Sequence, residues 1–203
     1  MTPRDTRLTL AIARTKVIID AATGWIEGVR RVVSPNCDDR PPGNELSLIV
    51  VHGISLPPGQ FGNGWIDRFF CNDLVAEADP FFATISDLTV SAHVLIARDG
   101  TLTQYVPFTR RAWHAGKSNY CGREGCNDFS VGIELEGTDE VPYAPPQYLA
   151  LAVLVATLRR TYASLRSAAV VGHSDIAPGR KTDPGPAFDW RKLKQLLEES
   201  NAT

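Results

Sequence analysis

Two histidines in the sequence stand where runs of apolar residues end. His52 follows Leu46–Val51 and His173 follows Ala168–Val171 and a glycine. Because residues at the ends of strands in a rigid sheet can converge on one point, the two imidazoles could form one site. Asp183 lies ten residues after His173 in a proline-rich loop, and two imidazoles with a carboxylate are a typical ligand set for catalytic zinc. The spacing alone fits two unrelated structural histidines equally well, because no compact motif links them.

Two glutamates could supply a general base. Glu134 and Glu136 alternate with apolar residues in the segment SVGIELEG, so in a strand both carboxylates point to one face, about 7 Å apart. A carboxylate in the middle of a strand is costly unless it is solvated or paired, which leaves two interpretations: one glutamate faces a site, or both lie on an exposed sheet face. A zinc hydrolase needs a base for its water, and Glu134 is the better-placed candidate.

The other two histidines have weaker patterns. His93 lies inside the predicted strand Val90–Ala97, which favours a hydrogen-bonded structural or pocket-lining histidine over a metal ligand. His114 follows Trp113 in the segment RRAWHAGKSNY. This segment is predicted either to line a groove for a sugar-like ligand or to be a surface loop that its tryptophan anchors.

Two other kinds of chemistry do not fit the sequence. The segment VGHSDI resembles the nucleophile elbow of serine hydrolases, but Ile176 replaces the final glycine and no histidine follows Ser174. The spacing Cys121-x4-Cys126 could be half of a zinc site, but no second pair completes it. All four cysteines are therefore interpreted as free thiols: Cys37, Cys71, Cys121 and Cys126.

The elements that must position these residues follow from periodicity and turn signals. The sequence predicts an α+β (mixed α/β) fold with a central mixed sheet flanked by helices. The predicted strands are Leu46–Val51, Val90–Ala97, Thr101–Val106, Ser130–Leu135 and Ala168–Val171, with an Asp-Gly turn joining the second and third. The predicted helices are Trp65–Cys71, Pro145–Tyr162 and Asp189–Glu199, the last capped by Asp189, and segments 111–129 and 174–188 are predicted to be loops.

Composition limits the function classes. The 203 residues are 43% hydrophobic and 22% charged, with a formal net charge of −2, which suits one globular domain and argues against nucleic-acid binding. The apolar-rich stretch Tyr143–Leu158 is too short to cross a membrane. The apolar run at 8–13 is shorter than a signal peptide requires, so we expect a cytoplasmic protein. We expect residues 1–23 to be an N-terminal extension of unknown role and 24–203 to be the domain.

Several segments together resemble the zinc N-acetylmuramoyl-L-alanine amidases, over about Trp25–Trp190. They are LSLIVVHGISLPPGQFG, VSAHVLIARDGTLTQYVPF, RRAWHAGKSNY, CNDFSVGIELEGTD and GHSDIAPGRKTDPGPAFDW. The resemblance implies a mixed sheet flanked by helices, the fold that these amidases share with peptidoglycan-recognition proteins.

The resemblance also implies roles for individual residues. One Zn²⁺ per chain is expected on His52, His173 and Asp183. Glu134 matches the catalytic carboxylate of the family, and Lys181 matches the lysine two residues before the last ligand, where its ammonium stabilises the oxyanion. Further candidates for contact with the substrate are Gly53, Trp113, His114 and Asn127.

The implied reaction is hydrolysis of the amide bond between the lactyl group of (1,6-anhydro-)N-acetylmuramic acid and L-alanine of the stem peptide, in cytosolic peptidoglycan recycling. The substrate is then a small muropeptide, and we expect a monomer without an obligate protein partner. Two alternatives remain: a non-catalytic muropeptide-binding module, and a periplasmic amidase that acts on intact peptidoglycan. Such binding modules usually lack a ligand, whereas all three matching positions are filled here.

Overall fold

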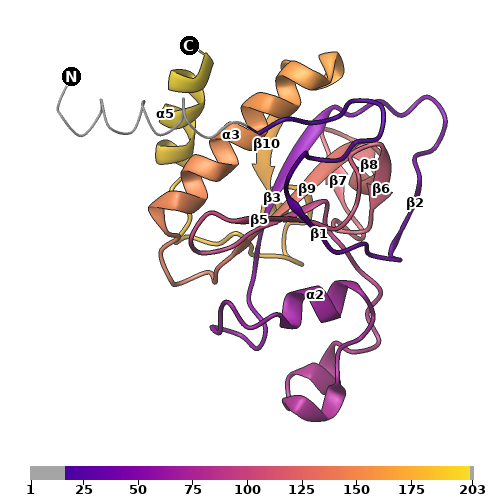
Figure 1. Ribbon diagram of the computed structural model, residues 1–203, viewed down its shortest axis with the longest axis vertical. Helices are drawn as coiled ribbons and strands as arrows, with labels where there is room; N and C mark the ends of the chain where they lie inside the picture. The colour runs from indigo at the N-terminus through magenta and orange to yellow at the C-terminus, as the bar shows by residue number, and fades with distance from the viewer. Residues whose placement is uncertain (1–16, 202–203) are drawn as a thin grey trace.

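A six-stranded mixed sheet forms the centre of the protein, in the order β1-β5-β4-β9-β3-β10 (Figure 1). The computed structural model describes residues 17–201. Neighbouring strands run parallel, except for the antiparallel pair β4 and β5. The strands of this sheet are β1 (Arg30–Arg31), β3 (Leu48–Ile54), β4 (Val94–Ile96), β5 (Leu102–Gln104), β9 (Ser130–Glu136) and β10 (Ala169–Gly172). The predicted fold class is confirmed.

The two longest strands, β3 and β9, lie side by side in the middle of this sheet. β9 is buried along its whole length and β3 along its first five residues, which explains why both have mostly apolar sequences. Their register pairs Leu48 with Ser130 and His52 with Glu134. A candidate ligand and the candidate base therefore stand at the same height on adjacent strands.

Two helices cover one face of the sheet. α3 (Pro145–Thr161) and α5 (Trp190–Asn201) lie together (Figure 1), and they share a core with the β9 residues Val131, Ile133 and Leu135. The carboxylate of Asp189 accepts hydrogen bonds from the backbone N–H groups of residues 191 and 192, at 3.0 Å each, which confirms the predicted cap. Because side chains alternate along a strand, Glu134 and Glu136 point to the other face.

The opposite side carries a second core. The long segment between β3 and β4 forms α2 (Trp65–Phe70) and the 3₁₀ turns η1 (Ala76–Ala78) and η2 (Phe82–Thr84), which lie below the sheet in Figure 1. Phe69 and Phe70 of α2 and Phe82 of η2 belong to this core. They share it with Leu95 of β4 and with Tyr105, which follows β5. This core supplies an apolar wall beside the carboxyl ends of the strands.

The structure corrects some predicted boundaries. β4 is shorter than the predicted strand Val90–Ala97, because Ser91 N–H donates to the Trp113 carbonyl and the Val90 carbonyl accepts from Asn36, both outside the sheet. The predicted loops contain ordered elements too short for periodicity to reveal. These are β6 (Arg110–Ala112), which pairs with β2 (Cys37–Asp39), the ribbon of β7 (Asn119–Tyr120) and β8 (Arg123–Glu124), and the turns η3 (Cys126–Asp128) and α4 (His173–Ile176); η4 (Ala163–Leu165) follows α3.

The predicted N-terminal extension falls partly on described residues. Ile19 forms a β-bridge with Ile26 and belongs to the main core, so residues 17–23 pack on the domain. Residues 1–16 lie outside the described part of the chain, and the boundary at 23/24 stays a prediction. Within residues 17–201, no helix is both long enough and apolar enough to cross a membrane.

Candidate metal centre

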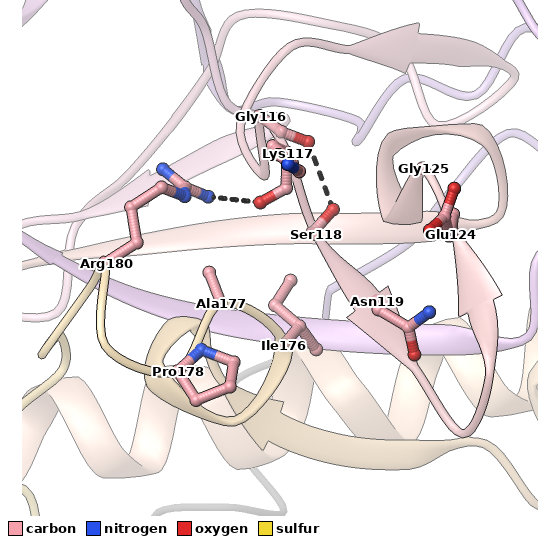
Figure 2. Close-up of a pocket in the computed structure, with 10 residues that line it drawn as sticks. All are labelled: Gly116, Lys117, Ser118, Asn119, Glu124, Gly125, Ile176, Ala177, Pro178 and Arg180. Atoms are coloured by element: carbon pink, nitrogen blue, oxygen red, sulfur yellow. Dashed lines mark hydrogen bonds between the residues drawn. The ribbon is translucent and has the colours of Figure 1, made fainter.

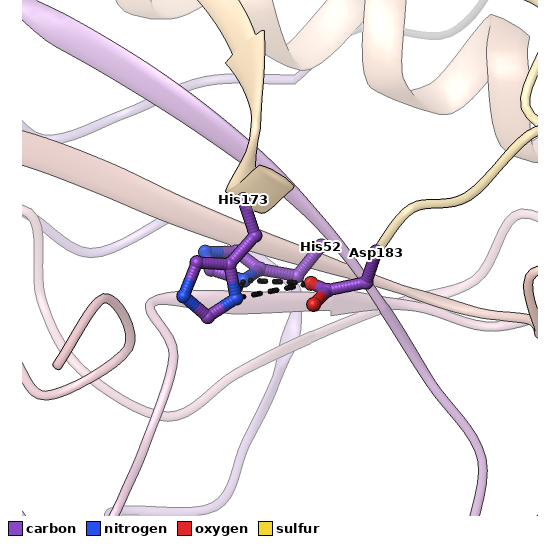
Figure 3. Close-up of side chains that lie close together, drawn as sticks. All are labelled: His52, His173 and Asp183. Atoms are coloured by element: carbon purple, nitrogen blue, oxygen red, sulfur yellow. Dashed lines mark hydrogen bonds and ion pairs between the residues drawn. The ribbon is translucent and has the colours of Figure 1, made fainter. Parts of the chain in front are cut away.

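Adjacent parallel strands bring the two candidate histidine ligands together. His52 is the fifth residue of β3, and His173 directly follows β10, whose last residue Gly172 pairs with Val51. Asp183 comes from the loop after α4, and its carbonyl accepts the Ser174 N–H at 3.0 Å, which ties the loop to the helix. Figure 3 shows the three side chains converging from these elements.

Three donor atoms of these residues form a tight triangle. His52 Nδ1 and His173 Nδ1 are 3.0 Å apart, and Asp183 Oδ2 lies 3.2 Å from the first and 3.1 Å from the second. A tetrahedron with arms of about 2.0 Å has edges of about 3.3 Å, so the triangle matches one face of a zinc site. Among residues 17–201 this is the one group of three or more metal-binding side chains. The donor set therefore fits zinc.

The protonation of His52 also suits a ligand. The side chain is 1% exposed, and burial is the main reason that its pKa is lowered to about 4. The imidazole is therefore neutral at neutral pH, as metal ligation requires.

Glu134 lies beside the triangle, and one of its carboxylate oxygens has no hydrogen-bond partner within residues 17–201. It is buried, and its Oε2 has no hydrogen-bond partner in the described structure. Burial, and next the charge of Asp183, raise its pKa well above the usual value. Glu136, by contrast, accepts hydrogen bonds from the backbone N–H groups of Gly62 at 2.7 Å and Arg98 at 3.1 Å. Both glutamates are buried, so the exposed-face alternative is wrong. The role of Glu134 as the base stays a prediction.

A cavity of about 400 Å³ opens over the triangle. Lys181, an exposed residue, lies on its lining together with Gly53. The apolar wall described above forms another side, made by Leu56, Phe69, Phe70, Phe81, Ile85 and Leu88. The cavity therefore joins a polar centre to an apolar surface. Sequence reasoning missed this wall, because α2 and η2 carry no motif.

The other candidate contacts have different surroundings. His114 lines the cavity, and its Nδ1 lies 2.9 Å from His52 Nε2. Trp113 and Asn127 are not among the lining residues. The indole N–H of Trp113 donates to Asp38 at 3.0 Å, and Asn127 Oδ1 accepts two backbone N–H groups. A direct role of these residues in substrate binding stays a prediction.

The side chain of Tyr143 packs directly against the backbone of Gly53. A Cβ atom there would lie 2.2 Å from the hydroxyl of Tyr143, which donates to the carbonyl of Pro184 at 3.0 Å. Tyr143 thereby links the end of β3 to the residue after Asp183. Sequence reasoning missed Tyr143, and no spacing signal marks it.

His93 is structural, which confirms one of its two predicted roles. It is fully buried, its Nδ1 accepts the Gly132 N–H at 3.0 Å, and its Nε2 lies 3.1 Å from the Arg110 carbonyl. It is not among the residues that line the cavity. The four cysteines are free thiols.

A second hollow, of about 330 Å³, lies behind α4. Figure 2 shows it between the segments 116–119 and 176–180, with Arg180 reaching across to donate to the Lys117 carbonyl at 2.8 Å. Its lining contains neither the triangle nor Glu134.

Comparison with known proteins identifies the family of this chain. The N-acetylmuramoyl-L-alanine amidase family matches residues 42–186. The 1,6-anhydro-N-acetylmuramyl-L-alanine amidase AmpD of Salmonella typhimurium is 56% identical over 178 residues, which cover 88% of this chain and 95% of the relative.

Solved structures agree as well. A crystal structure of an AmpD selenomethionine derivative has a TM-score of 0.85 and 53% identity, over 89% of this chain and 99% of that one. The amidase AmiD of E. coli, in complex with anhydro-N-acetylmuramic acid-L-Ala-D-gamma-Glu-L-Lys, has a TM-score of 0.52 and 31% identity, over 77% of this chain and 60% of that one. The chain belongs to the N-acetylmuramoyl-L-alanine amidase family.

Proposed function

We propose that this chain hydrolyses the amide bond between the lactyl group of 1,6-anhydro-N-acetylmuramic acid and L-alanine of the stem peptide, with one Zn²⁺ on His52, His173 and Asp183. The observation that carries the proposal is a triangle of ligand atoms beside a buried carboxylate with an unpartnered oxygen. The high identity to 1,6-anhydro-muramyl amidases over most of the chain supports the choice of substrate.

Zinc supplies, when bound, Lewis acidity and a water nucleophile near neutral pH. Glu134 takes the proton of the attacking water on its carboxylate, which lines the cavity together with the proposed ligands. Its raised pKa makes it a stronger base than an exposed glutamate and, once protonated, a competent acid. Glu134 then passes the proton to the nitrogen of L-alanine as the amide bond breaks.

Lys181 supplies positive charge to the carbonyl oxygen that becomes negative during attack. Replacing Lys181 by methionine is expected to lower kcat by about 10²–10³-fold, the typical cost of losing one oxyanion donor. Steady-state kinetics on anhydromuropeptide measure this, with zinc content determined in parallel. Lys117→Met is the matched control, because this exposed lysine lines the second hollow, and it is expected to keep its kcat. A Lys181→Met enzyme within threefold of the parent would show that the ammonium plays no part.

The reaction is tested with zinc-loaded protein and purified anhydromuropeptide. We expect release of the free stem peptide, measured by mass spectrometry, and little release from intact sacculi. Binding without release would identify a muropeptide-binding module instead. Faster release from sacculi would indicate an enzyme of intact peptidoglycan.

The cellular setting of the proposal is cytoplasmic peptidoglycan recycling, as the family resemblance implies, and we expect the chain to act as a monomer. Cell fractionation with an antibody to the chain tests the compartment. Light scattering of the purified protein tests the oligomeric state. Recovery of the chain in the periplasmic fraction would contradict the recycling role.

A further inference from the structure

In both histidines of the triangle, the second ring nitrogen, Nε2, lies within hydrogen-bond distance of the same dipeptide. His52 Nε2 lies 2.9 Å from His114 Nδ1, and His173 Nε2 lies 3.2 Å from the Ala115 carbonyl oxygen. His114 and Ala115 are neighbours in the segment between β6 and β7. One short piece of chain therefore contacts both ligands from behind.

The proton on His173 can be placed from this contact. A guanidinium nitrogen of Arg180 also lies 3.4 Å from His173 Nε2, but it donates to the Ala115 carbonyl at the much shorter distance of 2.6 Å. Because a carbonyl oxygen only accepts, we place the hydrogen of His173 on Nε2, which leaves its Nδ1 with a free lone pair. The same Ala115 carbonyl accepts a second hydrogen bond from Arg180 at 2.6 Å. Arg180 thus helps to hold the carbonyl in place.

The proton on His52 follows from a longer chain of hydrogen bonds. The hydroxyl of Ser130 donates to the Cys126 carbonyl at 2.5 Å, so its oxygen accepts from Nε2–H of His114 at 3.0 Å. Within residues 17–201 no carboxylate hydrogen-bonds to the buried ring of His114, which is therefore neutral, with Nδ1 as an acceptor. His52 must then donate through Nε2, which leaves its Nδ1 bare.

We propose that His114, Ala115 and Ser130 are positioning residues that fix the tautomers of both ligand histidines, so that two bare Nδ1 atoms face the metal position; this rests on the ligand set of the proposed function. The triangle is then made of three acceptor atoms 3.0–3.2 Å apart. Such acceptors repel one another until a cation lies among them. The network therefore prepares the site for a metal ion.

Two further residues hold the dipeptide. Asn127 Oδ1 accepts the backbone N–H groups of His114 at 3.0 Å and Ala115 at 2.7 Å. The ring of His114 packs on Gly132 of β9, where a Cβ atom would lie 2.3 Å from its Cγ. The glycine is needed there because the ring occupies the space of a side chain. Asn127 and Gly132 thus act on the ligands through His114 and Ala115.

The first test is zinc affinity, measured by competition with a chromophoric chelator. We expect His114→Ala to weaken zinc binding about 10–100-fold, as is typical when a group behind a ligand is removed. We expect Ser130→Ala to weaken it several-fold. Ser34→Ala is the matched control, because Ser34 is equally buried and also donates to a carbonyl at 2.5 Å, that of Phe70, away from the triangle. Equal zinc affinities of the Ser130→Ala and Ser34→Ala proteins would overturn the proposal.

The second test observes the tautomers directly. In metal-free protein with ¹⁵N-labelled histidine, two-bond ¹H–¹⁵N correlation spectra are expected to show Nε2–H for both His52 and His173. In Ser130→Ala the His52 signal shifts toward a tautomer mixture while His173 keeps Nε2–H. If His52 carries its proton on Nδ1 in the parent protein, the proposal is wrong. Both tests omit substrate, so failed hydrolysis of anhydromuropeptide would contradict the proposed function and leave this result standing.

Discussion

Glu134→Gln is expected to lower kcat by about 10²–10⁴-fold, the usual contribution of a general base, while the protein keeps one zinc per chain. Glutamine has the same shape as the glutamate but cannot accept a proton at neutral pH. The carboxylate stands on β9 opposite His52, with Oε2 free of protein partners. Turnover of anhydromuropeptide and zinc content by atomic absorption, measured on the same preparation, check the result.

Glu136→Gln is the matched control for this experiment. Glu136 lies two residues further along β9, on the same face, but both of its oxygens accept backbone hydrogen bonds from Gly62 and Arg98. Its replacement is expected to lower the free energy of unfolding and to leave kcat within a few-fold of the parent. A fully zinc-loaded Glu134→Gln enzyme with more than a tenth of the parent activity would remove Glu134 from the reaction.

Asp183→Asn is expected to abolish both tight zinc binding and activity. The substitution keeps the size of the side chain but removes its negative charge, so the proposed site loses its only anionic ligand and is left with a neutral amide oxygen, which binds zinc much more weakly. Zinc that binds the folded state raises the melting temperature by mass action. Thermal unfolding with and without added zinc should therefore show a shift for the parent protein and none for the variant.

The control for this prediction is Asp175→Asn. Asp175 also lies in the segment after β10, but it accepts the Gly172 N–H at 2.7 Å, a bond that an amide oxygen can replace. The Asp175→Asn protein is expected to keep one zinc per chain after dialysis. Retention of zinc by Asp183→Asn at the same level would assign the third ligand to another residue.

The sequence allowed prediction of the parts of the site that lie on apolar strands or directly after them. His52, Glu134 and His173 end or occupy such strands, and the alternation along β9 predicted the face of Glu134. The pattern could not show that β10 pairs with β3, because strand order depends on contacts between distant segments. For this reason the two histidines remained open to a structural interpretation until their strands were placed.

The residues that surround the proposed ligands could not be predicted for the same reason. His114 and Asn127 stand in a segment that the sequence predicts to be a loop, and their partners are up to 62 residues away. Ser130 and Gly132 look like ordinary residues of a strand. Their importance comes from a hydrogen bond and a packing contact, neither of which leaves a periodic signal.

The pairing of β10 with β3 has a consequence for biosynthesis. His52 and His173 are separated by 121 residues, so β3 and β9 leave the ribosome well before the second imidazole and the carboxylate are made. Contacts between such distant residues form slowly, because a large loop must close first. A nascent or truncated chain that ends before β10 lacks His173 and Asp183 and cannot assemble the triangle. The proposed zinc site therefore forms only in chains that include β10 and the loop after α4, once β10 has paired with β3.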